Sequence, residues 1–416
     1  MIIIYFGMAT PFTKSMSNYA GSPLGFLLPI FFTAYMIFKY KINFNKKSLL
    51  TVLGILVIWS IFQYLKQGYF TITTTFFLYY NIITAFIIFK IYGLSFFLMF
   101  EKFVVWLSVV SLIGWILVVI IPGPFSSLIT LLGGFKDDGT ITANIFIYSL
   151  TNSNYYSDFI ISRNSGFAWE PGRFACILLI AIFFNITRSK FRIHKNINLF
   201  ILMSAMLTTQ STTGYAGIII IIFFYFLNMS KIKKFMIVIP FTILAYLIIS
   251  LPFMSEKLKS QWFDDDVVNK VEVTEGWKEN DEVMVPTRLD GLALESLNFL
   301  NDFMLGYGTD QKDSFVQKTL FDRLFLANGL IKVFSKFGIF LGLIFYFMVY
   351  KFSKWHSKIF NYKGKLLYFC IFCVISTSYS FTKTPVLLSI LFFPYLMSGK
   401  RFYPRNTNHK VGLNEA

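Results

Sequence analysis

The chain alternates between long apolar runs and short charged or turn-forming breaks, and this pattern limits the fold more than any other feature. A helix that crosses the hydrocarbon core of a membrane takes about 20 apolar residues. We expect such spans at 1–13, 23–38, 48–64, 75–91, 97–121, 172–187, 197–210, 214–229, 235–253, 329–350, 366–380 and 385–397. Only 14% of the residues are charged, against about 25% in soluble domains. The sequence therefore predicts an all-α polytopic membrane protein with about 11–12 transmembrane helices.

Two breaks are much longer than the others, and they divide the chain into parts. Loops of this length are usually functional or disordered. The expected parts are N-terminal transmembrane helices (1–121), a first large loop (122–171), central transmembrane helices (172–253), a second large loop (254–328), C-terminal transmembrane helices (329–398) and a tail (399–416).

The charges predict which side of the membrane each loop occupies. Lys and Arg gather in one set of alternate breaks and in the tail, whereas every acidic residue except Glu101 and Glu415 falls on the other side. Cytoplasmic loops are rich in Lys and Arg. Both termini are therefore expected in the cytoplasm, and both large loops face outward. Topology and anionic lipid explain the net charge of +17, so no nucleic-acid partner is expected.

Cysteine and histidine give little sign of redox or metal chemistry. Cys370 and Cys373 form a C-x-x-C pair inside an apolar run, which favours two positions on a membrane helix. The three histidines are too far apart for a metal cluster. We expect neither a metal nor a cofactor. The apolar start of the chain lacks the basic residues of a cleaved signal peptide.

The second large loop changes character along its length. Residues 264–282 are strongly acidic, which is typical of a solvated flap. Residues 287–300 carry apolar side chains at helical spacing, and this pattern predicts an amphipathic helix at the membrane surface.

One candidate site lies where the first large loop ends. Arg163 and Gly166 precede Glu170, Pro171 and Arg173. Proline favours the first turn of a helix, and the N–H groups at a helix start attract anions. Gly166 would let backbone approach a ligand. The residues fit an anion site in which Glu170 orients an arginine, and they also fit a capped helix start with a structural Arg–Glu pair.

A second candidate stretch begins with Arg288 and Asp290 at the start of the amphipathic helix and continues to the turn Gly306-Tyr307-Gly308. Arg323 follows shortly before the next span. The glycines fit backbone approach to a ligand, and they also fit an ordinary tight turn. Arg323 fits either an anion site or an anchor at the membrane interface.

A third stretch, Thr208 to Gly214, crowds hydroxyl groups between two short spans. They could line a polar cavity or satisfy backbone groups where helices break. Lys383 lies in the last external turn as a further cation or an interfacial residue. Several arginines at an outer membrane face suit bidentate binding of phosphate, so the residues favour a lipid-linked anion as ligand.

At these positions the chain resembles the O-antigen polymerase/ligase superfamily. Residues 163–171 are similar to its R-x-x-G-x-x-x-E-P signature, and Arg288 followed by Leu305-Gly306-Tyr307-Gly308 is similar to its second signature. Residues 336–342 resemble its E-x-G-x-x-G segment, with Lys336 in place of the glutamate. The three segments occur in the order and on the side that the resemblance implies.

The resemblance implies a membrane glycosyltransferase (GT-C-like) fold in a bacterial inner membrane, with the active site facing the periplasm. The implied donor and acceptor are oligosaccharides linked to undecaprenyl pyrophosphate, and the implied protein partner is a chain-length regulator. Arg163 and Arg288 would hold the pyrophosphate, with Arg173, Arg323, Gly166, Gly306, Tyr307 and Gly308 also contacting substrate. Negative charge develops on the pyrophosphate as it leaves, and guanidinium groups positioned around it would stabilise that charge.

One departure separates the activities within the superfamily. Ligases carry a histidine about 11 residues before the position of Gly338, where this chain has Ala327. This favours a polysaccharide polymerase over a ligase, and Glu170, Asp290, Glu295 and Asp302 stay as candidates for a general base. A flippase or transporter is a further alternative, although transporters place charges inside their spans, and a membrane scaffold that binds anions is another.

Overall fold

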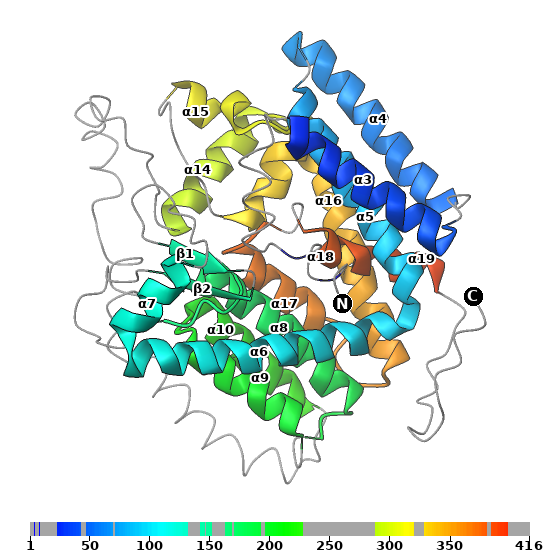
Figure 1. The fold of residues 1–416 in the computed structure, drawn as a ribbon. Coiled ribbons are helices and arrows are strands. Elements are labelled where there is room, and N and C mark those ends of the chain that lie inside the picture. The colour runs from blue at the N-terminus through cyan, green and yellow to red at the C-terminus, as the bar shows by residue number, and fades with distance from the viewer. Residues whose placement is uncertain are drawn as a thin grey trace.

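The computed structural model describes residues 4, 8, 23–42, 47–69, 71–131, 142–145, 147–151, 163–168, 170–192, 196–227, 288–319, 328–380 and 384–397. This part of the chain is predominantly helical (Figure 1). The helices are α3 (Pro23–Tyr40), α4 (Lys47–Gln67), α5 (Ile72–Tyr92), α6 (Phe96–Ile120), α7 (Pro122–Leu131), α8 (Pro171–Arg188), α9 (Ile197–Thr208), α10 (Thr212–Leu227), α14 (Arg288–Asn301), α15 (Phe315–Thr319), α16 (Gly329–Ile359), α17 (Leu367–Ser376), α18 (Pro385–Ser389) and α19 (Phe393–Leu396). Short 3₁₀ turns are η1 (Gly93–Ser95), η2 (Gln311–Asp313) and η4 (Ile390–Phe392).

Ten of the apolar runs lie in the described residues, and each of them is helical, as predicted. Within this part, four segments are long and apolar enough to cross a membrane: Leu49–Gln67, Thr74–Ile120, Pro171–Arg188 and Gly329–Ile359. The runs expected at 1–13 and 235–253 fall outside it, apart from residues 4 and 8. The acidic stretch 264–282 also lies outside the described residues.

The first large loop contains more regular structure than the sequence predicted. It begins with α7, and further along it forms a hairpin of two strands, β1 (Thr142–Ile145) and β2 (Tyr148–Thr151). The strands pair antiparallel, with Thr142 opposite Thr151 and Ile145 opposite Tyr148. Tyr148 is buried and its ring packs where a side chain on Gly114 of α6 would otherwise be. This contact packs the hairpin against α6.

The most buried helix is α8. Every residue in it is buried except Arg173 near its start and Arg188 at its end. It packs against α6, α9, α10 and α17, while α16 packs against both α17 and α14. In Figure 1 α6 runs across α8 and α9. Phenylalanine rings from α5, α6, α8, α16, α17 and α19 fill the centre, among them Phe97, Phe184 and Phe352.

Apolar side chains also cover much of the outside of the bundle. On α4 the exposed residues include Ile58, Ile61 and Leu65, and on α6 they include Ile113 and Ile120. Water-soluble proteins rarely expose apolar patches of this extent. These faces are what a bundle surrounded by lipid would present.

The helix α16 is longer than predicted and is broken once. The sequence predicts a span at 329–350, whereas the helix continues to Ile359 and therefore includes Lys351, Lys354 and Lys358. Gly338 inside it has φ 74° and ψ 177°, so two helical halves meet there. Backbone groups released by such a break need partners when water is excluded, and the second large loop supplies them.

Candidate polar site at one end of the bundle

Arg163 lies against the end of α9. Its Nε donates to the carbonyl oxygen of Thr209 at 3.2 Å, and its Nη2 donates to that of Gln210 at 3.1 Å. These carbonyls follow the last turn of α9, where helix carbonyls have no intrahelical partner. The guanidinium group is therefore held by two fixed acceptors and stays partly exposed.

The next residues tie the same segment to the bundle. The Asn164 side chain donates to Thr208 Oγ1 at 2.9 Å and to Ser111 Oγ of α6 at 3.3 Å. The Gly166 N–H donates to Asn164 Oδ1, and the Gly166 carbonyl accepts from the Ser149 N–H of β2. Gly166 is buried in these backbone contacts. Residues 163–168 are thus placed by α6, α9 and the hairpin together.

Glu170 and Arg173 form the exposed edge of the site. Glu170 is the N-cap residue of α8, with φ −145° and ψ 133°, and Pro171 occupies the first turn as predicted. Arg173 Nε lies 3.4 Å from Glu170 Oε2, and the Glu170 side chain is 50% exposed. The Arg173 guanidinium also lies 5.0 Å from the centre of the Tyr379 ring, at a distance typical of a cation–π contact.

Tyr379 connects this edge to two further helices. Its hydroxyl group forms a 2.6 Å hydrogen bond with Thr384 Oγ1 just before α18. The Tyr379 carbonyl lies 2.4 Å from the position that a Cβ on Gly329 would occupy. Tyr379 therefore contacts both the start of α16 and the Arg173 guanidinium.

The start of α14 is the next neighbour in this chain of contacts. A Cβ on Gly291 would lie 3.8 Å from the Cβ of Asn328. Asn328 caps α16, accepting from the N–H groups of Leu330 and Ile331. Arg288 begins α14, one turn before Gly291. The backbone that carries Arg288 and Asp290 is thus joined to the Arg173 edge through Asn328, Gly329 and Tyr379.

The hydroxyl-rich stretch 208–214 lies in the same region. Its members satisfy helix ends, since Thr209 Oγ1 donates to the Met206 carbonyl at 2.7 Å. Thr213 Oγ1 and Ser378 Oγ are 2.5 Å apart, so this stretch also touches the turn that carries Tyr379. These contacts match the structural interpretation of the stretch, and they place it beside Arg163.

The turn Gly306-Tyr307-Gly308 fills the break in α16. The Tyr307 N–H donates to the Ser335 carbonyl at 2.8 Å, the Gly308 N–H donates to the Lys336 carbonyl at 3.0 Å, and the Ile339 N–H donates to the Phe303 carbonyl at 2.9 Å. All three residues of the turn are buried. The second and third matched segments therefore bind each other through backbone.

Residues of α4 hold the opposite side of this turn. Gln63 Nε2 donates to the carbonyls of Leu305 and Gly306, and Gln67 Nε2 donates to that of Tyr307. Lys66 forms a 2.5 Å ion pair with Asp302. A hollow lined by Gln63, Gln67, Gly308 and other polar residues has room for about one water molecule.

Glu295 lies in a second buried cluster between α14 and α16. Its side chain is fully buried, accepts a 2.5 Å hydrogen bond from Ser335 Oγ and lies 3.6 Å from Lys332 Nζ. Glu295 and Asp302 are thus engaged by partners away from Arg163 and Arg173. Of the three candidate carboxylates whose side chains the structure describes, Glu170 is the one that lies beside Arg173.

Some predicted site residues lie outside the description. The side chains of Arg288 and Asp290 are not described, and Arg323 and Lys383 fall in undescribed segments.

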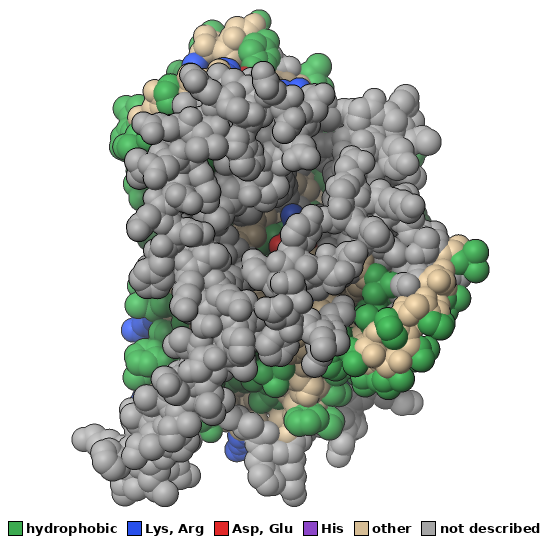
Figure 2. All heavy atoms as spheres, turned by 90° about the vertical axis from the view of Figure 1, so that its left-hand side faces the viewer, with side chains coloured by type: hydrophobic (Ala, Val, Ile, Leu, Met, Phe, Trp, Pro, Cys, Tyr) green, Lys and Arg blue, Asp and Glu red, His purple; other side chains and the backbone are tan. Residues whose placement is uncertain are grey.

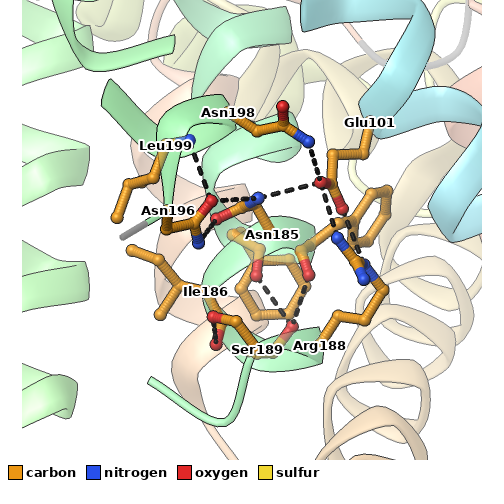
Figure 3. A network of polar contacts seen from close by, with 11 residues as sticks. Glu101, Asn185, Ile186, Arg188, Ser189, Asn196, Asn198 and Leu199 are labelled. Atoms are coloured by element: carbon orange, nitrogen blue, oxygen red, sulfur yellow. Dashed lines mark hydrogen bonds and ion pairs between the residues drawn. The ribbon is translucent and has the colours of Figure 1, made fainter. Parts of the chain in front are cut away.

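A separate polar network lies at the other end of α8 (Figure 3). Arg188 donates to both carboxylate oxygens of the buried Glu101, at 2.8 and 2.7 Å, and Asn185 Nδ2 donates to Glu101 Oε1 at 2.8 Å. Asn198 and Asn196 of the α9 region complete the network. Asn185 and Arg188 lie in the last turn of α8, whereas Arg173 lies in its first turn. At a rise of about 1.5 Å per residue, the network is about 20 Å from Arg173.

Sequence reasoning missed the residues that connect the site. Tyr379 lies inside an apolar run and gives no polar signal, and Asn164 was not selected although it lies inside the first matched signature.

Figure 2 shows basic and acidic side-chain atoms close together in a hollow on one face of the molecule. Among the described residues, no three His, Cys, Asp or Glu side chains are grouped as metal ligands would be.

No family model, curated protein or solved structure matches the chain.

Proposed function

We propose that the protein is a bacterial inner-membrane polysaccharide polymerase with a GT-C-like fold of eleven or twelve transmembrane helices. It transfers a growing glycan from undecaprenyl pyrophosphate to the non-reducing end of another lipid-linked oligosaccharide repeat. The reaction takes place on the periplasmic side, and both termini are cytoplasmic. A chain-length regulator is part of the proposal as a partner.

One observation carries the proposal: a series of contacts links the segments that resemble the three signatures. Arg173 lies over Tyr379, Tyr379 touches Gly329, and Asn328 touches the first turn of α14. The turn 306–308 is bound to α16 on both sides of Gly338. Segments separated by more than a hundred residues thus form one assembly, as a shared substrate would require.

In the proposed reaction, an acceptor hydroxyl oxygen bonds to the anomeric carbon of the donor glycan while the bond from that carbon to the pyrophosphate oxygen breaks. Arg163 and Arg288 bind the pyrophosphate and stabilise the charge that it gains. Glu170 accepts the hydroxyl proton, and Arg173 holds Glu170 in place. Two carbonyls fix the Arg163 guanidinium before substrate binds, which reduces the reorganisation needed in the transition state.

Histidine does not take part in this scheme. His356 is fully buried in the aromatic core, where its Nδ1 lies 3.1 Å from the Tyr362 hydroxyl group. It lies near the end of α16, far along the helix from Gly329. The proposal of a polymerase rests on Ala327, which stands where the ligases carry their histidine.

The test is a reaction with purified protein in lipid nanodiscs and the undecaprenyl-pyrophosphate-linked repeat from the bacterium that carries the gene. We expect a ladder of longer glycans, and we expect Arg163→Ala and Arg288→Ala to abolish it. Lys318→Ala, an exposed cation on α15, is the matched control and should leave the ladder unchanged. Movement of the repeat across the membrane without lengthening would identify a transporter and refute the proposal.

A further inference from the structure

The helix α14 has its polar and apolar sides arranged opposite to those of a helix in water. Residues 291, 295 and 298 share the side that faces the protein, and they are Gly291, Glu295 and Asn298, all buried. Residues 293, 297, 300 and 304 continue one stripe on the other side, and they are Ala293, Leu297, Leu300 and Met304, all exposed. A helix exposed to water normally turns its apolar stripe toward the core.

The buried polar side has its own partners, so the arrangement is a stable one. Glu295 accepts a hydrogen bond from the Ser335 hydroxyl group and lies beside Lys332, as described above. Asn298 Oδ1 accepts from the Val316 N–H at 2.9 Å. Burying polar groups is tolerated when they are hydrogen-bonded or paired. Hence polar contacts fix α14 to α16, and the apolar side chains of α14 point away from the protein.

The outer stripe of α14 joins an apolar band on α16. Phe303, just after α14, is exposed, and its carbonyl is bonded to the Ile339 N–H. The next residue, Phe340, begins a stripe of exposed side chains at helical spacing: Phe340, Leu343, Ile344 and Phe347. This stripe belongs to a segment that is long and apolar enough to cross a membrane. The solvent that surrounds this exposed face of α16 therefore also surrounds the exposed side of α14.

We propose that α14 is embedded in the outer leaflet of the membrane, with Leu297, Leu300, Phe303 and Met304 against the acyl chains of bilayer lipid. With 14 residues it is about 20 Å long, too short to cross a core of about 30 Å. It is also not among the segments that are apolar enough to cross a membrane. It therefore lies within one leaflet. This inference rests on the proposed topology, in which the second large loop faces the periplasm, and not on the catalytic step.

The test measures what surrounds the stripe. A nitroxide is attached at Leu300→Cys in protein whose three native cysteines are replaced by alanine, reconstituted in vesicles of phosphatidylethanolamine and phosphatidylglycerol. We expect collisions with oxygen, which concentrates in lipid, to exceed those with a water-soluble nickel chelate several-fold. Lys318→Cys is the control at an exposed polar position and should show the reverse. The same preference at both positions for the nickel chelate would overturn the proposal.

A second measurement keeps the native cysteines. A photoreactive benzoylphenylalanine replaces Leu300 in the full chain, and the products of irradiation in the same vesicles are identified by mass. Adducts with phospholipid support the proposal. Adducts with a second copy of the chain would show that the stripe is a protein interface and would overturn it.

Discussion

At the scale of single residues, the pair Gly306 and Gly338 explains why two distant glycines are needed. Gly338 has φ 74°, and a Cβ on it would lie 2.0 Å from the Met304 carbonyl oxygen. A Cβ on Gly306, with φ 73°, would lie 2.3 Å from the Lys336 carbonyl. Both positions combine a left-handed backbone with backbone contact, so no other residue type fits either position without displacing the turn or α16.

We therefore expect Gly338→Ala to destabilise the protein by more than about 2 kcal/mol, because left-handed strain alone is worth about 1–2 kcal/mol. Gly54→Ala is the matched control, since Gly54 lies inside α4 with nothing within 4 Å. That variant should be neutral or more stable by up to about 1 kcal/mol. Thermal unfolding in detergent measures both, and equal unfolding midpoints would contradict the described contact.

Tyr69 offers a prediction about pH. Its hydroxyl group donates to Asp313, and this hydrogen bond raises the Tyr69 pKa from about 10 to about 12. Because the folded pKa is the higher one, the contact stabilises the fold fully below about pH 10, and this contribution disappears as pH rises through about 12. Subtracting the tyrosinate absorbance titration of Tyr69→Phe from that of the native chain should reveal one step near pH 12. A step near pH 10 in place of the one near pH 12 would mean that the contact is absent.

At the scale of elements, α8 joins the two polar regions of the molecule. Its only unburied residues are Arg173, at the candidate site, and Arg188, which pairs with Glu101 at the far end. A buried helix tilts or shifts only if both ends allow it. The Glu101 network therefore fixes one end of the helix whose other end carries Arg173.

This role predicts a specific pattern of stability. Replacing Arg188 by Met leaves the fully buried Glu101 carboxylate without its cation, which should cost about 3 kcal/mol. The double variant Glu101→Gln with Arg188→Met should recover much of that loss, because the uncompensated charge is gone. A double-mutant cycle of unfolding midpoints measures the coupling, and additive effects would show that the pair contributes little.

Most helices followed directly from the sequence, since apolar runs bounded by charges specify membrane helices through length alone. Pro171 marked the start of α8, and the spacing of residues 287–300 marked α14. The break at Gly338 and the hairpin β1–β2 were not predicted, because both depend on partners distant in sequence: the turn 306–308 for the break and Gly114 for Tyr148. The sequence also suggested a stripe on α14 without showing which side it would face.

At the scale of the whole molecule, the candidate site is a meeting point of helix ends. The starts of α8, α10, α14, α16 and α18 and the turn after α17 lie in one series of contacts. Arg163, Glu170 and Arg173 could be selected from sequence because charges are rare near apolar runs. Tyr379 could not, since an apolar run hides a residue whose importance comes only from its neighbours.

The most direct test of the account is a structure of the protein with an undecaprenyl-pyrophosphate-linked glycan bound. We predict that the diphosphate lies within charge-assisted hydrogen-bond distance, about 2.7–2.9 Å, of the guanidinium groups of both Arg163 and Arg288, with Glu170 facing the anomeric carbon. Density for the diphosphate elsewhere on the protein, with these two arginines unengaged, would contradict the account.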